Sequence, residues 1–153
     1  MMKDSAADES SGAAQERRAP RRQGHRVPRV EISWGELVDR YTIMKLKLRN
    51  FKDPHCRTPL QAEVSNLQRE MDWFLESIPE ANVFHKKMRL INSQLWNLEN
   101  KVRSLIRAGD TGEVFIKTAR SITLKNGKRS ALKEAINKVA GTGIEEVKIY
   151  QLD

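Results

Sequence analysis

The sequence predicts an all-α domain organised around a long antiparallel helical hairpin over residues 58–109. Apolar residues recur there at alternating spacings of four and three, the a/d pattern of a coiled coil. The pattern changes phase around Pro79, so we expect the chain to double back there and to pair the two series in mirror order, with Leu67 beside Leu95. The first series is Leu60, Val64, Leu67, Met71, Phe74 and Ile78, and the second is Phe84, Met88, Ile91, Leu95, Leu98, Val102 and Leu105.

The composition favours the same fold class. Charged residues make up 31% of the 153 residues and aromatic residues only 6%, which suits amphipathic helices better than a β-sandwich. The net charge is +8, and residues 1–30 hold seven Lys and Arg against four Asp and Glu. The remaining basic excess is spread out, so it can attract anions or simply keep the protein soluble.

The two ends of the chain differ from its middle. Residues 1–28 contain no aromatic residue and only one β-branched residue, Val27, so we expect a disordered tail before a single helical domain over residues 29–153. Residues 29–32 and 146–150 each alternate charged or polar with apolar residues. We expect these two short segments to pair as a small two-stranded ribbon.

The first helix follows Ser33, which forms a capping box with Glu36. Asp39 is expected outside its apolar face. Pro54 is expected to end this helix, and Thr58 with Pro59 to start the next one. The apolar face of the first helix consists of Trp34, Leu37, Val38, Tyr41, Met44, Leu48 and Phe51.

Two shorter helices are expected after the hairpin. Gly109 is a C-cap candidate, and Asp110 or Thr111 can cap a helix that ends at Asn126 and Gly127. The last helix covers residues 128–140 and is closed by Gly141. These two helices have the outline of a helix-turn-helix with basic residues on the second, which leaves nucleic-acid binding open. No basic run with interleaved aromatic residues, of the kind that stacks bases, accompanies them.

Several kinds of chemistry are not predicted. His25, His55 and His85 lie far apart, and His55 with Cys56 offers only two neighbouring ligands, so we predict no metal site. No nucleotide-binding or hydrolase motif occurs, and we predict neither a cofactor nor particular catalytic residues. A single cysteine suits a reducing compartment, and no apolar run approaches about 20 residues. We therefore expect a cytoplasmic protein without a membrane span.

A set of polar residues forms the candidate site. Asn92, Trp96, Glu99 and Arg103 share one flank of the second hairpin helix, at spacings of four, three and four. If that flank faces the first and last helices, five more polar residues converge on it. The set then binds a small anion or sugar phosphate through Arg and Lys, or it is a structural salt-bridge network. The five further residues are Glu36, Arg120, Arg129, Lys133 and Asn137.

Four stretches, taken together, resemble an uncharacterised bacterial family of short helical proteins. They are residues 32–44, 95–100, 119–121 and 132–137, and the resemblance extends over about residues 32–150. It implies no established activity. Members of the family tend to accompany sugar-transfer and surface-polysaccharide genes, which implies a role near glycan assembly. Lys45, Asn97, Asn100 and Gly127 stand where the family usually has acidic residues, so no carboxylate site at those positions is implied here.

Three functions are compatible with these patterns. The first, which we favour, is a non-enzymatic binding or adaptor module with a protein partner, since it needs only a rigid helical domain with an exposed face. The second is a small helical enzyme or binder of an anionic or sugar-phosphate ligand. The third is nucleic-acid binding through the basic C-terminal helix pair. The patterns do not address the oligomeric state.

Overall fold

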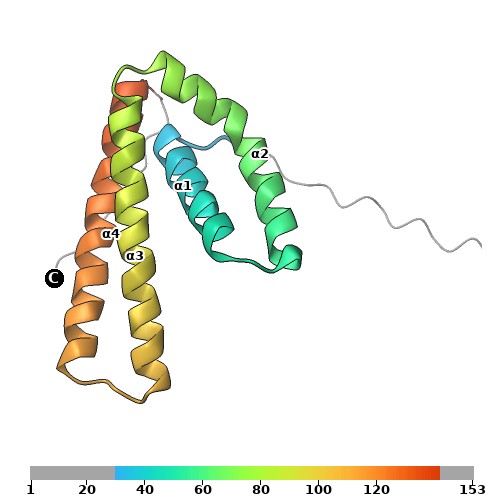
Figure 1. The fold of residues 1–153 in the computed structure, drawn as a ribbon. Coiled ribbons are helices and arrows are strands. Elements are labelled where there is room, and N and C mark those ends of the chain that lie inside the picture. Colours follow the sequence, from blue (N-terminus) through green and yellow to red (C-terminus); the bar gives the residue numbers. More distant parts are fainter. Residues whose placement is uncertain (1–29, 142–153) are drawn as a thin grey trace, which may run out of the picture. The chain divides into compact units, whose positions relative to one another are not determined.

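A computed structural model describes residues 30–141, and these residues form four α-helices (Figure 1). The helices are α1 (Trp34–Asn50), α2 (Pro54–Ser77), α3 (Ala81–Arg107) and α4 (Glu113–Ala140). The predicted all-α fold class is confirmed. The chain divides into two units, residues 1–30 and 31–153, and all four helices belong to the second. The predicted tail and the second strand of the expected ribbon lie outside the described residues.

Helix α1 begins after the predicted N-cap, Ser33, whereas the carboxylate of Glu36 pairs with Lys133. The Ser33 hydroxyl accepts a hydrogen bond from the backbone N–H of Glu36 at 3.2 Å. At the other end of α1, the guanidinium of Arg57 donates to the carbonyl oxygens of Leu48 at 2.6 Å and Phe51 at 3.0 Å. Arg57 lies in the first turns of α2, so it also ties the second helix to the end of the first.

Helix α2 begins five residues earlier than expected. Pro54 is its first residue, and the carboxylate of Asp53 accepts from the backbone N–H of His55 at 2.9 Å as the N-cap contact. Proline suits the first position of a helix because its missing N–H has no helical partner there. The expected start at Thr58 and Pro59 is therefore wrong, and Pro59 lies inside the helix.

Helix α4 is one continuous helix of 28 residues, where two shorter helices were expected. A glycine inside a helix costs only about 1 kcal/mol relative to alanine, which packing along α3 offsets. Lys125, two residues before Gly127, makes one contact with α3, because its Nζ donates to Gln94 Oε1 at 2.6 Å. Gly109 and Gly141 have φ angles of 70° and 65° at the ends of α3 and α4, as expected for C-terminal caps. The expected caps of α4 are also wrong, because its N-cap is Gly112.

The arrangement of the helices differs from the predicted pairing in one respect. The long antiparallel pair consists of α3 and α4, while α2 packs mainly on α1 and shares few contacts with α3 (Figure 1). Leu67 and Leu95 thus belong to different helix pairs. An apolar stripe shows which face of a helix is buried but does not identify the partner, and the continuous α4 is the partner that matches α3 in length.

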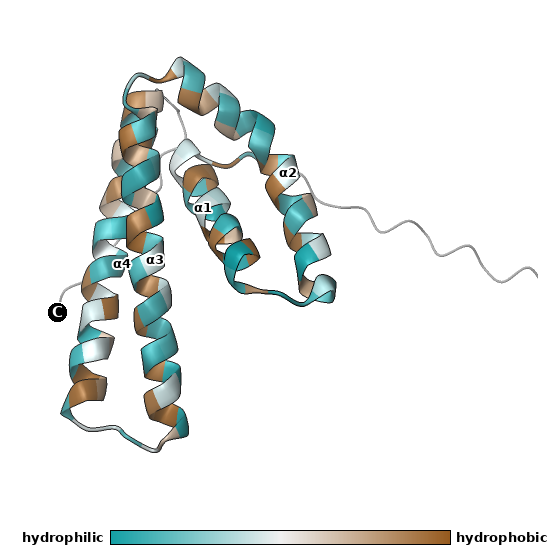
Figure 2. Cartoon of the chain, viewed as in Figure 1, coloured by the Kyte–Doolittle hydropathy of each residue, from teal (hydrophilic) through white to brown (hydrophobic). Residues whose placement is uncertain are grey.

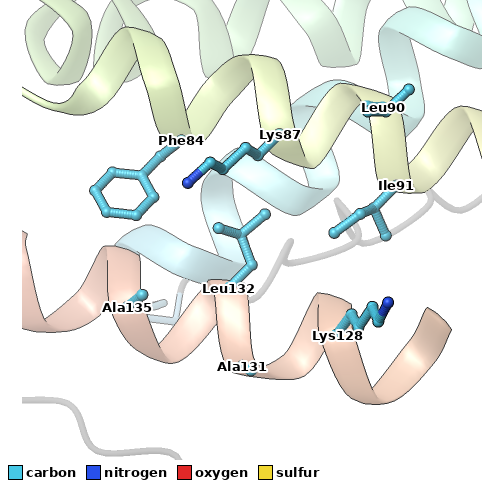
Figure 3. A pocket seen from close by; sticks show the side chains of 8 residues that line it. All are labelled: Phe84, Lys87, Leu90, Ile91, Lys128, Ala131, Leu132 and Ala135. Atoms are coloured by element: carbon cyan, nitrogen blue, oxygen red, sulfur yellow. The ribbon is translucent and has the colours of Figure 1, made fainter. Parts of the chain in front are cut away.

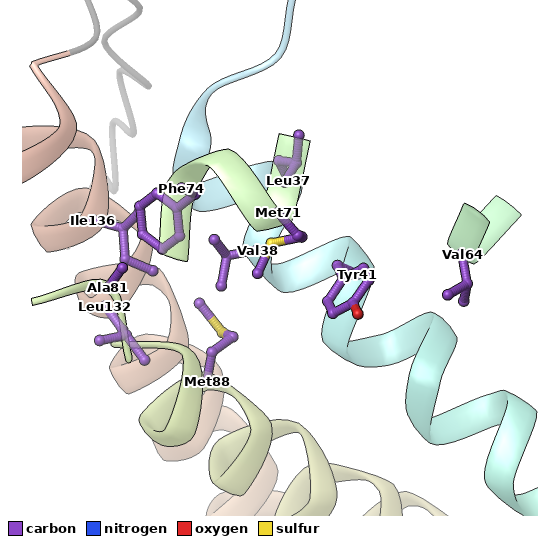
Figure 4. Packing of buried hydrophobic residues seen from close by; sticks show 10 residues of the cluster. All are labelled: Leu37, Val38, Tyr41, Val64, Met71, Phe74, Ala81, Met88, Leu132 and Ile136. Carbon is purple, nitrogen blue, oxygen red and sulfur yellow. The ribbon is translucent and has the colours of Figure 1, made fainter. Parts of the chain in front are cut away.

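Helix α1 is the central element, because it packs extensively against all three other helices, whereas α3 has few contacts with α2. Its Val38 lies in the main core with Met71 and Phe74 of α2, Met88 of α3 and Ile136 of α4, all 0% exposed (Figure 4). A second buried stripe of α1 consists of Gly35, Asp39, Thr42 and Leu46 at helical spacing, and three of these four residues are small or polar. None of the four described helices is long and apolar enough to cross a membrane.

Candidate functional site

Four polar side chains from three helices meet beside the core. The side-chain amide of Asn92 in α3 donates to Asp39 Oδ1 at 2.7 Å and to Thr42 Oγ1 at 2.8 Å, both in α1. Arg129 of α4 completes the group, with its Nε 3.9 Å from Asp39 Oδ2 and its Nη1 donating to Asn92 Oδ1 at 3.4 Å. Asp39, Thr42 and Asn92 are 6, 2 and 3% exposed. Because buried polar groups need partners, these bonds hold α1, α3 and α4 in register.

A second polar contact joins the beginning of α1 to the last turns of α4. The backbone N–H of Gly35 donates to the side-chain oxygen of Asn137 at 2.7 Å, and Lys133 Nζ donates to Glu36 Oε2 at 2.6 Å. The Lys133 side chain is only 11% exposed and the Glu36 side chain 47%. These contacts supply a partner for one unpaired N–H at the α1 N-terminus and neutralise a nearly buried ammonium group.

The backbones of α1 and α4 pack closely at Gly35. A Cβ atom placed on Gly35 meets the carbonyl oxygen of Lys133 at 2.5 Å and its Cα at 2.8 Å. Both atoms belong to the backbone of α4 and cannot swing away as a side chain can. Only glycine allows this approach, and the approach brings Glu36 and Asn137 within reach of their partners.

The remaining predicted site residues lie apart from this group. Trp96 is half-buried and packs edge-on against Phe51 with ring centroids 6.0 Å apart. Glu99 and Arg103 form an i,i+4 ion pair at 3.8 Å, and both side chains are about half exposed. Arg120 is exposed on α4 and forms no ion pair with any residue from 30 to 141. Five of the nine predicted residues thus sit in helix contacts around α1: Glu36, Asn92, Arg129, Lys133 and Asn137.

Three residues of this region were not predicted. Asp39 was expected outside the buried face of the first helix, and this expectation is wrong because the carboxylate is buried against α3 and α4. Gly35 and Thr42 were not singled out. A signal was present in the sequence, since Gly35, Asp39, Thr42 and Leu46 follow helical spacing as a second stripe. Small and polar residues at that spacing indicate close packing between helices as readily as exposure.

One titratable side chain has a shifted pKa. Burial lowers the pKa of His85, and the positive charges of Arg89 and Lys45 lower it further. The His85 ring lies 6.0 Å from the ring of Tyr41, whose hydroxyl donates to Gln68 Oε1 of α2 at 2.7 Å. His85 is therefore a neutral packing residue at neutral pH. In the described part of the chain, no three His, Cys, Asp or Glu side chains gather closely enough to hold a metal ion.

The distal parts of α3 and α4 project past the other two helices (Figure 1). We call residues 97–124 the arm, and within it Thr118 alone is classed as buried. At its tip, on either side of the connection between α3 and α4, Ile106, Val114 and Ile116 are 57, 47 and 62% exposed. The hydropathy colouring shows apolar residues on both helices at this tip (Figure 2). Leu124 is also 60% exposed, nearer the middle of α4.

The fold and the polar contacts define a class of small helical proteins in which α3 and α4 are held against α1 by polar contacts beside the core. Within this class, the chain belongs to a family of unknown function, DUF6165, whose model matches residues 28–152. No match was found among curated proteins. None was found among solved structures either.

Proposed function

We propose that the protein is a non-enzymatic binding module that acts by contact with a partner protein, as an adaptor does. The observation that carries this proposal is the exposed apolar tip of the arm, formed by Ile106, Val114 and Ile116. Single exposed apolar residues are normal on a protein surface. Apolar residues that gather at one place are typical of interaction sites, since their contact with water is unfavourable until a partner covers them.

The charged candidate residues support the same function. Glu36 is paired with Lys133, and Asp39 is bonded to Asn92 and faces Arg129. A ligand that used these groups has to break contacts that join helices. The alternative function, binding or conversion of an anionic or sugar-phosphate ligand, therefore depends on Arg103 and Arg120 of the arm.

The other proposed details follow from sequence. The predicted helix-turn-helix is a single continuous helix. The basic charge of α4 is therefore the one remaining feature that favours nucleic-acid binding. The resemblance to a family whose members accompany sugar-transfer genes points to partners in surface-glycan assembly, in the cytoplasm. The accompanying genes thus indicate the class of partner, and the exposed apolar tip of the arm indicates the surface that binds it.

Affinity purification from the cells that make the protein tests this proposal. The tagged chain is crosslinked in the cell, and its partners are compared with those of an Ile106→Asp, Ile116→Asp double variant. We expect a partner with the unaltered chain and at least about tenfold less of it with the variant, because a buried carboxylate opposes an apolar contact. Both substitutions are at exposed positions, so the melting temperature changes little.

The matched control is a Val83→Asp, Val139→Asp double variant, which alters two apolar residues that are 52 and 40% exposed outside the arm. The control variant is expected to recover the partner in full. Equal recovery with the arm variant, or a partner lost equally from both variants, contradicts the proposed role of the arm.

A further inference from the structure

A second apolar surface lies between α3 and α4, on the part of the pair away from the arm's tip. It is an open groove of about 440 Å³ (Figure 3). Neither α1 nor α2 contributes to its lining. Leu132 is 9% exposed, whereas Leu90 is 58% exposed. The lining residues are Phe84, Lys87, Leu90 and Ile91 of α3, and Lys128, Ala131, Leu132 and Ala135 of α4.

The charges of the groove all have one sign. Among the described residues that line it, Lys87 and Lys128 alone are charged, and they stand on opposite walls (Figure 3). Both are exposed, and neither forms an ion pair with a described residue. The groove thus combines an apolar lining with two unneutralised ammonium groups at its rims. This combination complements a ligand that is apolar along its centre and acidic along its edges.

The size of the groove matches a short helix. Its lining covers residues 84–91 of α3 and 128–135 of α4, which is about two helical turns, or roughly 10 Å, on each wall. The small side chains of Ala131 and Ala135 leave room above α4 for another backbone. A third helix that lies along two antiparallel helices places apolar residues at i, i+3 or i+4, and i+7 into such a groove.

We propose that this groove binds an amphipathic helix of a partner protein, in which Asp or Glu residues flank a short apolar stripe. The apolar stripe covers Leu90, Ile91 and Leu132, and the flanking carboxylates pair with Lys87 and Lys128. This inference rests on the proposed function in that the chain acts by binding proteins. It uses a different surface from the arm's tip, so the two can be tested separately.

Fluorescence anisotropy with the full chain tests the groove. The probe is a labelled designed peptide of about 15 residues, long enough to form a helix, with a leucine stripe flanked by glutamates. We expect saturable binding that weakens as sodium chloride is raised. A peptide with the same stripe flanked by lysines is expected to bind at least about tenfold more weakly, since two rim charges then repel it.

Charge reversal assigns the binding to the groove. In a Lys87→Glu, Lys128→Glu double variant, the preference between the two peptides is expected to reverse. The matched control is a Lys86→Glu, Lys101→Glu double variant, because both lysines are exposed and neither lines the groove. This control changes the net charge equally and is expected to keep the original preference.

Several results overturn the proposal. They are no binding of either peptide, equal binding of both, or a preference that Lys87→Glu, Lys128→Glu leaves unchanged. If the chain self-associates in sedimentation experiments and the Lys87→Glu, Lys128→Glu variant does not, the groove binds a second copy of the chain. Displacement of the designed peptide by a synthetic peptide of residues 142–153 at lower concentration assigns it to the chain's own end. If these experiments fail while the arm variant still loses its partner, the groove proposal falls alone and the proposed function stands.

Discussion

Replacing Gly35 by alanine is expected to destabilise the protein by roughly 1–3 kcal/mol, the range for a side chain forced into a packed contact. The added Cβ meets the Lys133 carbonyl oxygen at 2.5 Å, so α1 and α4 must separate. Separation weakens the bond from the Gly35 N–H to Asn137 and the pair between Glu36 and Lys133. Alanine favours a helix over glycine by about 1 kcal/mol, and the steric cost outweighs that gain.

The matched control for this substitution is Gly127→Ala, which lies in the interior of α4. A Cβ atom at Gly127 meets no atom within 4 Å apart from the neighbouring backbone of its own helix, so only the helix preference of alanine remains. We expect Gly127→Ala to stabilise the protein by about 0.5–1 kcal/mol. Urea unfolding of both variants measures the two effects. A Gly35→Ala variant as stable as the unaltered chain contradicts the close contact between α1 and α4.

Replacing Phe74 by alanine is expected to lower the free energy of unfolding by about 3–5 kcal/mol. Phe74 of α2 is 0% exposed and stacks on Trp34 of α1 with ring centroids 5.5 Å apart. The substitution leaves a cavity among residues of all four helices. Because a domain of this size is stable by about 5–15 kcal/mol, the loss is a large share of the total, and the melting temperature falls by roughly 10–20 °C.

Phe51→Ala is the matched control, because Phe51 is 42% exposed. Among the described aromatic rings, it contacts Trp96 alone, in a T-shaped arrangement. We expect its cost to be about 1 kcal/mol or less. Thermal unfolding of both variants distinguishes the two positions. Equal losses from the two substitutions contradict the burial of Phe74 in the core formed by the four described helices.

Local features of the fold were predictable from the sequence because they depend on nearby residues. The Ser33 and Glu36 cap, the glycine caps at Gly109 and Gly141, and the turn at Pro79 follow from backbone preferences over a few positions. The buried faces of α2 and α3 followed from their spacing. Their partners did not, since an apolar stripe carries no information on which helix covers it. The pairing of α3 with α4 depends on whether the helix continues through Gly127. Asn126 and Gly127 locally favour an end to the helix, but packing along α3 stabilises its continuation.

The candidate site was predictable in part for the same reason. Glu36, Lys133 and Asn137 were expected to converge on the flank of α3 that carries Asn92, and the structure brings these three to a contact between α1 and α4. The group around Asn92 includes Asp39, which was expected outside the apolar face, and Thr42, which was not singled out. Whether a polar stripe faces water or another helix depends on the position of that helix, which is a long-range property.

We propose that the polar residues around α1 hold helices together and that binding takes place on exposed apolar surfaces. The most direct test is the melting temperature of the full chain with inorganic phosphate, nucleoside diphosphates and sugar nucleotides. A ligand at about 100 times its Kd stabilises a folded protein by roughly 2.7 kcal/mol, an easily measured shift. We expect no saturable shift at millimolar concentrations, because Arg129, Lys133 and Arg103 are already paired with carboxylates and Arg120 alone offers an anion only one charge. A saturable rise that an Arg103→Ala, Arg120→Ala double variant abolishes would contradict this expectation and assign the arm to an anionic ligand.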